Sequence, residues 1–271
     1  MAIFNMPLII FFLPLLLHQA ASSISATSRC GNADPDPPRG SVRRFAYFPG
    51  EPRWTRSPPI HLTYALSPYN TIDYINRPAI ESAIRRSFAR WARVIPVTFS
   101  PAGSYGAADV KVAFYGGDHG DGQPFDGVLG VLAHAFSPTS GQLHLDAAER
   151  WAVDFGAEES KVSVDLESVL THEIGHVLGL AHSPEKEAVM YPSLSPRTKK
   201  VDLTVDDVRG VQALYGSNPN FTLSSLSESE TSSSSSSKGR GRVNNGGILD
   251  GLIRISLITG FYLFVALILA R

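Results

Sequence analysis

The middle of the chain alternates short strand-like segments with longer amphipathic ones. Residues 60–66 alternate apolar and polar positions and are rich in strand-forming side chains, which predicts a strand. Apolar residues then recur at intervals of three and four from Ile80 to Ile95, the pattern of a helix with one buried face. Asn76 and Pro78 precede this face, as expected of a helix cap followed by a proline in the first turn.

The remaining pattern completes one domain. Short strands are predicted at residues 97–100, 110–114, 130–136 and 142–146, and further helices at 165–179 and 204–214. Thr204 and Asp207 have the spacing of a capping box, and Gly216 is a typical helix stop. Strands interleaved with three helices predict a mixed α/β domain at residues 45–217.

The first 21 residues have the composition of a secretory signal peptide. Their apolar run, at residues 7–17, is too short to span a membrane, and small residues follow it. A buried core helix would also be apolar, but Pro7, Pro14 and the N-terminal position argue against one.

The other end of the chain also has the composition of a processing signal. Residues 218–247 form a linker whose Ser/Glu/Thr tract cannot bury a core. Residues 248–271 end in an apolar run that is shorter than the roughly 20 residues of a helical span. Small residues, a spacer and this tail predict a GPI-attachment signal, with the attachment residue among 235–237 or 244–246, and hence a plasma-membrane anchor. A membrane-spanning tail is the alternative.

Composition and charge narrow the partners. The chain has 24 Lys and Arg against 25 Asp and Glu, so we expect no nucleic-acid partner. Asn220, in the sequence Asn-Phe-Thr, is an N-glycosylation acceptor and agrees with secretion. Cys30 is the single cysteine, so no disulfide can form within the chain.

The strongest chemical signal is the sequence HEIGHVLGLAH, which runs from His172 to His182. His172 and His176 lie one helical turn apart on the same face, so both imidazoles can bind one ion. Gly179 can end the helix in a left-handed turn, and the returning chain then supplies His182. Three neutral histidines leave a fourth position for water, which is the open site of a catalytic zinc. An HExxH sequence can arise by chance, but the added glycine and third histidine argue for a metal site.

Glu173 follows the first of these histidines, where its carboxylate can reach a water on the metal. Zinc lowers the pKa of such a water to about 7. Glu173 is then the predicted general base, and it returns the proton to the leaving amine. The motif therefore predicts a zinc-dependent endopeptidase.

A second set of metal ligands precedes this motif. It offers three imidazoles and one carboxylate, a closed tetrahedral set, from His119, Asp121, His134 and His144. A single histidine is more often a surface or core residue, but four donors around two predicted strands favour a second zinc.

Together these motifs resemble the metzincins and, within them, the matrixins (matrix metalloproteinases). The resemblance covers residues 29–216 and includes Ser183 directly after the third histidine and Met190 in the sequence AVMYP. Residues 48–54 and 62–65 are most similar to the plant members. The resemblance implies a metzincin catalytic domain with three helices and a twisted, mostly parallel five-stranded sheet. It also implies that Met190 is the Met-turn residue beneath the catalytic zinc and that the second cluster is a structural zinc site.

The resemblance further implies at least one structural calcium ion. Oxygen ligands suit this hard cation, and they would be the carboxylates of Asp126, Asp146 and Glu149 and the carbonyls of Gly127, Leu129 and Val131. A second calcium site would use Asp109, but the neighbouring loop at 137–142 has no carboxylate, which argues against it.

Cys30 lies in the sequence RCGNAD, which resembles the cysteine switch of matrixin zymogens. Its thiolate could take the open position on the catalytic zinc. We expect residues 22–44 to be a truncated propeptide, because few residues separate Cys30 from the predicted signal peptide. Such a short propeptide predicts weak latency.

The predicted partners are extracellular protein or peptide substrates, bound by a monomer. Residues 129–135 would form the sheet edge along which a peptide lies, and Pro192, Ser193 and Leu194 would wall the pocket after the scissile bond. Two alternatives are a non-catalytic zinc-bearing surface module, which the intact Glu173 disfavours, and a membrane-spanning signalling protein, which the short tail disfavours.

Overall fold

The computed structural model describes residues 45–224 and 226. Its larger sheet has the strand order β2-β1-β3-β5-β4, and only β4 runs antiparallel to its neighbour. A small parallel pair, β6-β7, lies apart from it. The bounds are β1 (Ile60–Leu66), β2 (Val97–Pro101), β3 (Val110–Tyr115), β4 (Ala133–Ala135), β5 (Gln142–Asp146), β6 (Trp151–Ala152), β7 (Val164–Asp165), α1 (Arg77–Val94), α2 (Leu166–Val177) and α3 (Val205–Tyr215). The predicted α/β class, with three helices and a mostly parallel five-stranded sheet, is confirmed.

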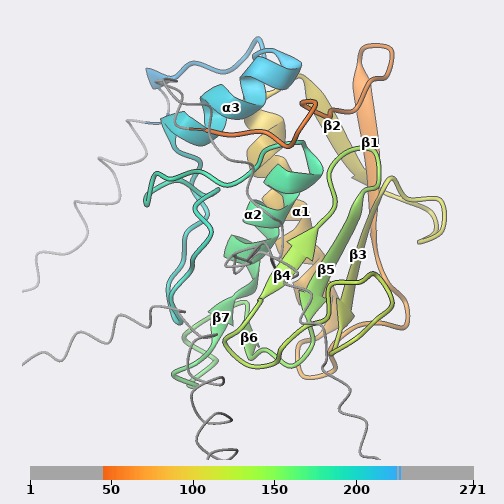
Figure 1. Ribbon diagram of the computed structural model, residues 1–271, viewed down its shortest axis with the longest axis vertical. Coiled ribbons are helices and arrows are strands. Elements are labelled where there is room, and N and C mark those ends of the chain that lie inside the picture. The colour runs from red at the N-terminus through yellow and green to blue at the C-terminus, as the bar shows by residue number, and fades with distance from the viewer. Residues whose placement is uncertain (1–44, 225, 227–271) are drawn as a thin grey trace, which may run out of the picture.

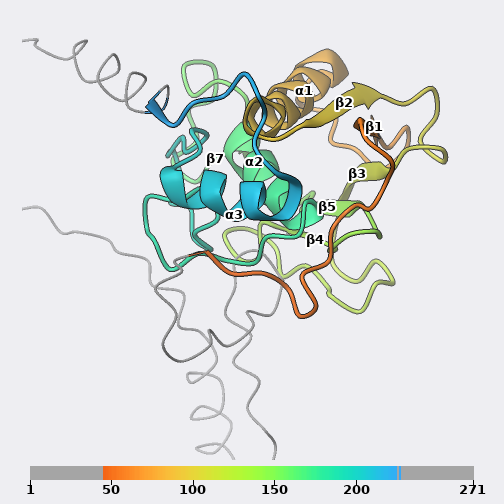
Figure 2. The ribbon, with the colours of Figure 1, turned by 90° about the horizontal axis from the view of Figure 1, so that it is seen from above.

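Helices α1 and α2 pack side by side on the same side of the sheet (Figures 1 and 2). The Asn76 side chain caps α1 by accepting a hydrogen bond from the backbone N–H of Ala79, as its sequence predicts. The apolar face of α1 is buried, and the Trp91 indole near the C-terminal end of the helix donates to the carbonyl oxygen of Thr171 in α2 at 2.9 Å. This bond joins α1 to the helix that carries the HExxH motif.

Every residue of α2 is buried, because α1 packs against the helix on one side and strands β4 and β5 pack against it on another. A helix buried on all sides must give each of its polar side chains a partner or a function. Asp165 caps its first turn by accepting from the Ser168 backbone N–H at 2.8 Å. The helix ends at Val177, slightly earlier than predicted. Gly179 follows at a φ of 105°, and a Cβ there would lie 2.2 Å from the Pro52 carbonyl oxygen. Only glycine fits this turn, which brings His182 back to within 3.2 Å of His176.

Helix α3 has the predicted capping box between Thr204 and Asp207, and Gly216 caps its C-terminal end. The buried Asp207 carboxylate also accepts from the backbone N–H groups of Val189 and Met190, each at 3.0 Å. One side chain therefore joins the start of α3 to the segment that contains Met190.

The strand predicted at residues 130–136 is much shorter, since β4 covers only Ala133–Ala135. The residues before it turn back on themselves, with Leu129 at a φ of 63°. The backbone N–H groups of Leu129 and Val131 bond to the carboxylates of Glu149 and Asp126 instead of to a neighbouring strand. The β6-β7 pair was not predicted, because two-residue strands carry no periodic signal.

No helix within the described part of the chain has both the length and the apolar character needed to cross a membrane. The predicted signal peptide, Cys30, most of the linker and the predicted attachment tail lie outside the described residues.

Candidate active site

The three histidines of the predicted catalytic site meet at one point. His172 and His176 come from α2, and His182 comes from the segment after the Gly179 turn. The Nε2 atom of His176 lies 3.1 Å from that of His172 and 3.2 Å from that of His182. All three side chains are buried, and their ligand atoms form one group that could hold a metal ion.

Backbone carbonyls fix the orientation of two of these rings. His172 Nδ1 lies 2.6 Å from the Val189 carbonyl oxygen, and His176 Nδ1 lies 2.8 Å from that of Leu180. A carbonyl can only accept, so both Nδ1 atoms carry the proton and both Nε2 atoms present a lone pair. The tautomers are therefore those that a metal at the meeting point requires.

The protonation equilibria favour metal binding as well. Burial, together with repulsion from His182, lowers the pKa of His172 to about 3. Burial and the two neighbouring histidines also lower the pKa of His176 well below its usual value. Neutral imidazoles are the form that binds a metal, so the donor set fits zinc.

Glu173 and Met190 are both buried near this centre. Glu173 is fully buried on α2, where it follows His172 and precedes His176 in the sequence. Met190 is buried beneath α2, directly after Val189, whose carbonyl orients His172. The role of Asp207 in holding Val189 and Met190 was missed from the sequence, where its capping box gave only a local role.

The second predicted cluster also comes together. Asp121 Oδ2 lies 2.7 Å from Nε2 of both His119 and His134 and 2.9 Å from His144 Nδ1. His134 and His144 face each other across the antiparallel β4-β5 pair, and their ring nitrogens are 3.2 Å apart. The four ligand atoms form a second histidine-containing group in the described chain that could hold a metal ion.

Charge and aromatic packing shape this second cluster. Burial lowers the pKa of His144 to about 4, so this ring is neutral at physiological pH. Burial by itself would raise the pKa of Asp121, but the Gln123 backbone N–H and the bonds from His134 and His144 hold it well below its usual value. One carboxylate and three imidazoles are a donor set that fits zinc. Tyr115, Phe125 and Phe136 pack around the histidine rings. This aromatic packing was not predicted from the sequence.

The predicted calcium ligands lie in one loop cluster beside β5. Asp146 and Glu149 are fully buried, and the backbone N–H of Gly127 donates to Asp146 at 3.2 Å. Burial raises the pKa of Glu149 to about 7, and the charges of Asp146 and Asp126 add to the rise. Glu149 Oε2 is buried without a hydrogen-bond partner in the described structure. Buried acids that disfavour each other's charge, with one open oxygen, fit a hard cation.

Asp109 would be a ligand of the second calcium site, which the sequence argues against. In the structure its carboxylate is paired with Arg56. Arg56 donates to both of its oxygens, and the backbone N–H and hydroxyl of Thr63 donate to Oδ2 at 2.8 and 2.9 Å. These bonds account for the charge of Asp109 and give no reason to place an ion there.

The predicted substrate-binding edge, pocket wall and glycosylation acceptor also lie within the described residues. β4 is an edge strand of the larger sheet, so the edge predicted at residues 129–135 exists over Ala133–Ala135. Ser193 is exposed and Leu194 is half-buried after the Met190 segment. Asn220 and Thr222 are exposed, as a glycosylation acceptor requires.

An HExxH helix that ends at a glycine turn, with a third histidine and a methionine beneath it, defines a metzincin-type metal site. The family model described as matrixin matches residues 53–216. The chain therefore belongs to the matrixin family, as its sequence predicts.

Its relatives include plant and animal proteins. Metalloendoproteinase 4-MMP of Arabidopsis thaliana is 59% identical over 202 residues, which are 73% of this chain and 59% of the relative. Metalloendoproteinase 1-MMP of the same plant is 51% identical over 78% of this chain and 59% of the relative. Interstitial collagenase of Oryctolagus cuniculus is 40% identical over 71% of this chain and 37% of that protein. The chain thus spans about 59% of the length of these two plant relatives, and the predicted plant character is confirmed.

Proposed function

We propose that this protein is a zinc metalloendopeptidase that hydrolyses internal peptide bonds of extracellular proteins. The observation that carries the proposal is the convergence of the Nε2 atoms of His172, His176 and His182 beside the buried Glu173. Membership of the matrixin family and the metalloendoproteinase names of the relatives support it.

In the proposed reaction, three histidines bind the metal and Glu173 transfers the proton. His172, His176 and His182 would hold zinc, which when bound supplies Lewis acidity and makes a coordinated water more acidic. Glu173 accepts the proton of the attacking water and then delivers it to the nitrogen of the leaving amine.

The substrate would bind as an extended peptide along β4. The outer edge of this strand has unpaired backbone groups that can add a peptide strand. Pro192, Ser193 and Leu194 would wall the pocket for the side chain after the scissile bond.

Two further metal sites would support the domain. His119, Asp121, His134 and His144 would hold a structural zinc, and no position of this closed set is left for substrate. Asp126, Asp146 and Glu149, with the carbonyls of Gly127, Leu129 and Val131, would hold at least one calcium ion.

We infer the location and control of the protein from its sequence. We infer a signal peptide at residues 1–21, a propeptide with the Cys30 switch at 22–44, a catalytic domain at 45–217, a linker at 218–247 and a GPI signal at 248–271. The protein would then be a secreted monomer, anchored on the outer face of the plasma membrane or held in the extracellular matrix, with a glycan on Asn220.

Cleavage of internally quenched peptides by the purified chain tests the activity. We expect cleavage that a chelator stops, that added zinc restores, and that the Glu173→Ala variant lacks while it still binds zinc. Undiminished cleavage by Glu173→Ala would falsify the proposed mechanism. Zinc binding without any cleavage by the unaltered chain would instead favour the non-catalytic surface module.

A further inference from the structure

The segment that follows the Met190 turn is tied down by its basic residues. Arg197 is the first of them, and its guanidinium donates to the carbonyl oxygens of Phe155, Glu158 and Ser160 at 2.9, 2.7 and 3.0 Å. The Arg197 backbone N–H donates to the Ser163 carbonyl oxygen at 2.8 Å. Arg197 therefore fastens its segment to the loop between β6 and β7 through side chain and backbone together.

The backbone of Arg197 shows that these bonds are strong enough to hold a costly conformation. Its φ is 57°, in the left-handed region that residues with a Cβ seldom adopt. Such a conformation persists only where the surroundings over-determine it, and it often marks a functional position. The guanidinium also lies over the Phe155 ring, 5.0 Å from its centroid.

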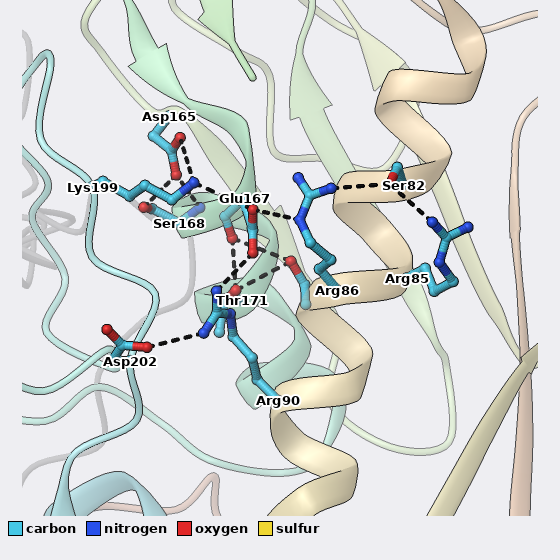
Figure 3. A network of polar contacts seen from close by, with 11 residues as sticks. Ser82, Arg85, Arg86, Arg90, Asp165, Glu167, Ser168, Thr171, Lys199 and Asp202 are labelled. Atoms are coloured by element: carbon cyan, nitrogen blue, oxygen red, sulfur yellow. Dashed lines mark hydrogen bonds and ion pairs between the residues drawn. The ribbon is translucent and has the colours of Figure 1, made fainter. Parts of the chain in front are cut away.

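Lys199 ties the same segment to the active-site helix. Its ammonium lies 3.4 Å from Glu167 Oε2 and 3.9 Å from Asp165 Oδ2, at the start of α2 (Figure 3). Glu167 is buried and also accepts from Arg86 and Arg90 of α1, each at 2.9 Å. Figure 3 shows that Lys199 reaches this buried carboxylate from the side opposite to α1.

Lys200 supplies a third tie, toward the segment before Met190. Its ammonium donates to the carbonyl oxygens of Lys186 and Ala188 at 2.6 and 3.0 Å. Its backbone N–H donates to the Ser168 hydroxyl of α2 at 2.7 Å. Three basic side chains of residues 197–200 thus bond to three different parts of the fold.

These ties leave a short span between two fixed points. Asp207 holds the backbone of Val189 and Met190 on one side, and Arg197 holds the other side. The span between them contains Pro192, Ser193 and Leu194, the proposed wall of the pocket after the scissile bond. With both ends fixed, the wall has less freedom to move outward than a segment held at one end only.

We propose that Arg197, supported by Lys199, is a positioning residue that fixes this wall and narrows the choice of substrate side chain after the scissile bond. The inference rests on the proposed peptidase function and deepens it. A rigid apolar pocket distinguishes side chains that differ by one methylene about 10- to 200-fold. A wall that yields loses most of this discrimination, because the pocket adjusts to the larger side chain.

The test uses a peptide series that differs only in the residue after the scissile bond. For the unaltered chain we expect a steep fall in kcat/KM beyond one side-chain size. In Arg197→Ala the kcat/KM ratio between the best side chain and the next larger one should fall at least about fivefold. The kcat for the best peptide should stay within about twofold, because Arg197 touches no reacting group. Lys199→Met should act in the same direction, and Arg93→Ala, an exposed arginine of α1 outside this network, should change nothing.

Hydrogen exchange gives a readout that does not need cleavage. Amides in residues 191–200 should exchange about tenfold faster in Arg197→Ala than in the unaltered chain, while those of α2 keep their protection. If the unaltered chain cleaves no peptide, the proposed function is wrong. The exchange result then still tests whether Arg197 holds residues 191–200 in place. If exchange is unchanged in Arg197→Ala, or the variant slows all peptides equally, the positioning role is wrong. If Arg197→Ala does not fold, Lys199→Met carries both measurements.

Discussion

Gly175 lies so close to Met190 that a Cβ at residue 175 would sit 2.2 Å from the Met190 sulfur. Gly175 occupies the position in α2 directly before His176, and Met190 is fully packed in the core. The close approach of helix and methionine is therefore possible only without a side chain on residue 175.

The first prediction follows from this contact. Gly175→Ala should destabilise the domain by about 1–3 kcal/mol, since the core must repack around the added methyl group. This cost exceeds the gain of up to about 1 kcal/mol in helix propensity. Urea unfolding measures the change. Gly103→Ala, at a position with open space, is the matched control. The Met190→Ala background should recover part of the loss, and a fully stable Gly175→Ala protein would contradict the packing argument.

The second prediction concerns Glu167 and pH. Burial raises the pKa of Glu167, but the hydrogen bonds from Arg90 and Arg86 and the charge of Lys199 outweigh it, so the pKa lies below 4.5. The ion pairs therefore stabilise the fold fully above pH 4.5, and this stabilisation is lost as the pH falls through the lower folded-state pKa. Glu167→Gln should lower the free energy of unfolding at pH 7 by about 3 kcal/mol, because it leaves arginines facing a neutral amide.

Urea titrations at pH 7, 5 and 3.5 test this pH dependence. The difference between Glu167→Gln and the unaltered chain should be large at the first two values and shrink at the lowest. Glu81→Gln breaks the exposed pair with Arg77 and should cost no more than about 1 kcal/mol. A Glu167→Gln effect that stays constant down to pH 3.5 is the outcome that the ion-pair account does not allow.

The third prediction is the zinc content. We expect each chain to bind two zinc ions, one in each of the two histidine groups. His176→Ala and His144→Ala should each reduce the content to one, and only His144→Ala should keep the catalytic ion. Atomic absorption on dialysed protein measures the content. His61→Ala, which removes a histidine bonded to Thr98 and Ser100 outside both groups, should still bind two. Unchanged content in His144→Ala would rule out the second site.

The fourth prediction concerns calcium. At fixed zinc, saturating calcium at about 100 times its Kd should add about 2.7 kcal/mol to the free energy of unfolding. For a domain of this size, that corresponds to a rise in Tm of about 5–10 °C. Differential scanning calorimetry checks the shift. Asp126→Asn should reduce it, whereas Glu159→Gln, an exposed acid elsewhere in the chain, should leave it intact. Equal shifts in both variants would mean that calcium binds somewhere else.

Local patterns predicted the elements with strong periodicity and clear caps. The amphipathic face from Ile80 to Ile95 gave α1, and Thr204 with Asp207 gave the start of α3. The strand at residues 130–136 was predicted too long, because the Asp126 carboxylate binds the backbone N–H of Val131 that such a strand needs, and Glu149, 20 residues away, binds that of Leu129 just before it. Pattern reasoning counts apolar positions and cannot see such competition.

The sequence by itself determined that His172, His176 and His182 come together, since their geometry is local. The helical spacing of His172 and His176 and the Gly179 turn bring three imidazoles together within one short segment. Only the tertiary structure decided which ring nitrogens face the centre, because carbonyls of Val189 and Leu180 choose the tautomers. It alone also joined Arg197 to the Phe155 loop, a contact across 42 residues. Such contacts depend on how the whole chain packs, and no spacing of residues within one segment encodes them.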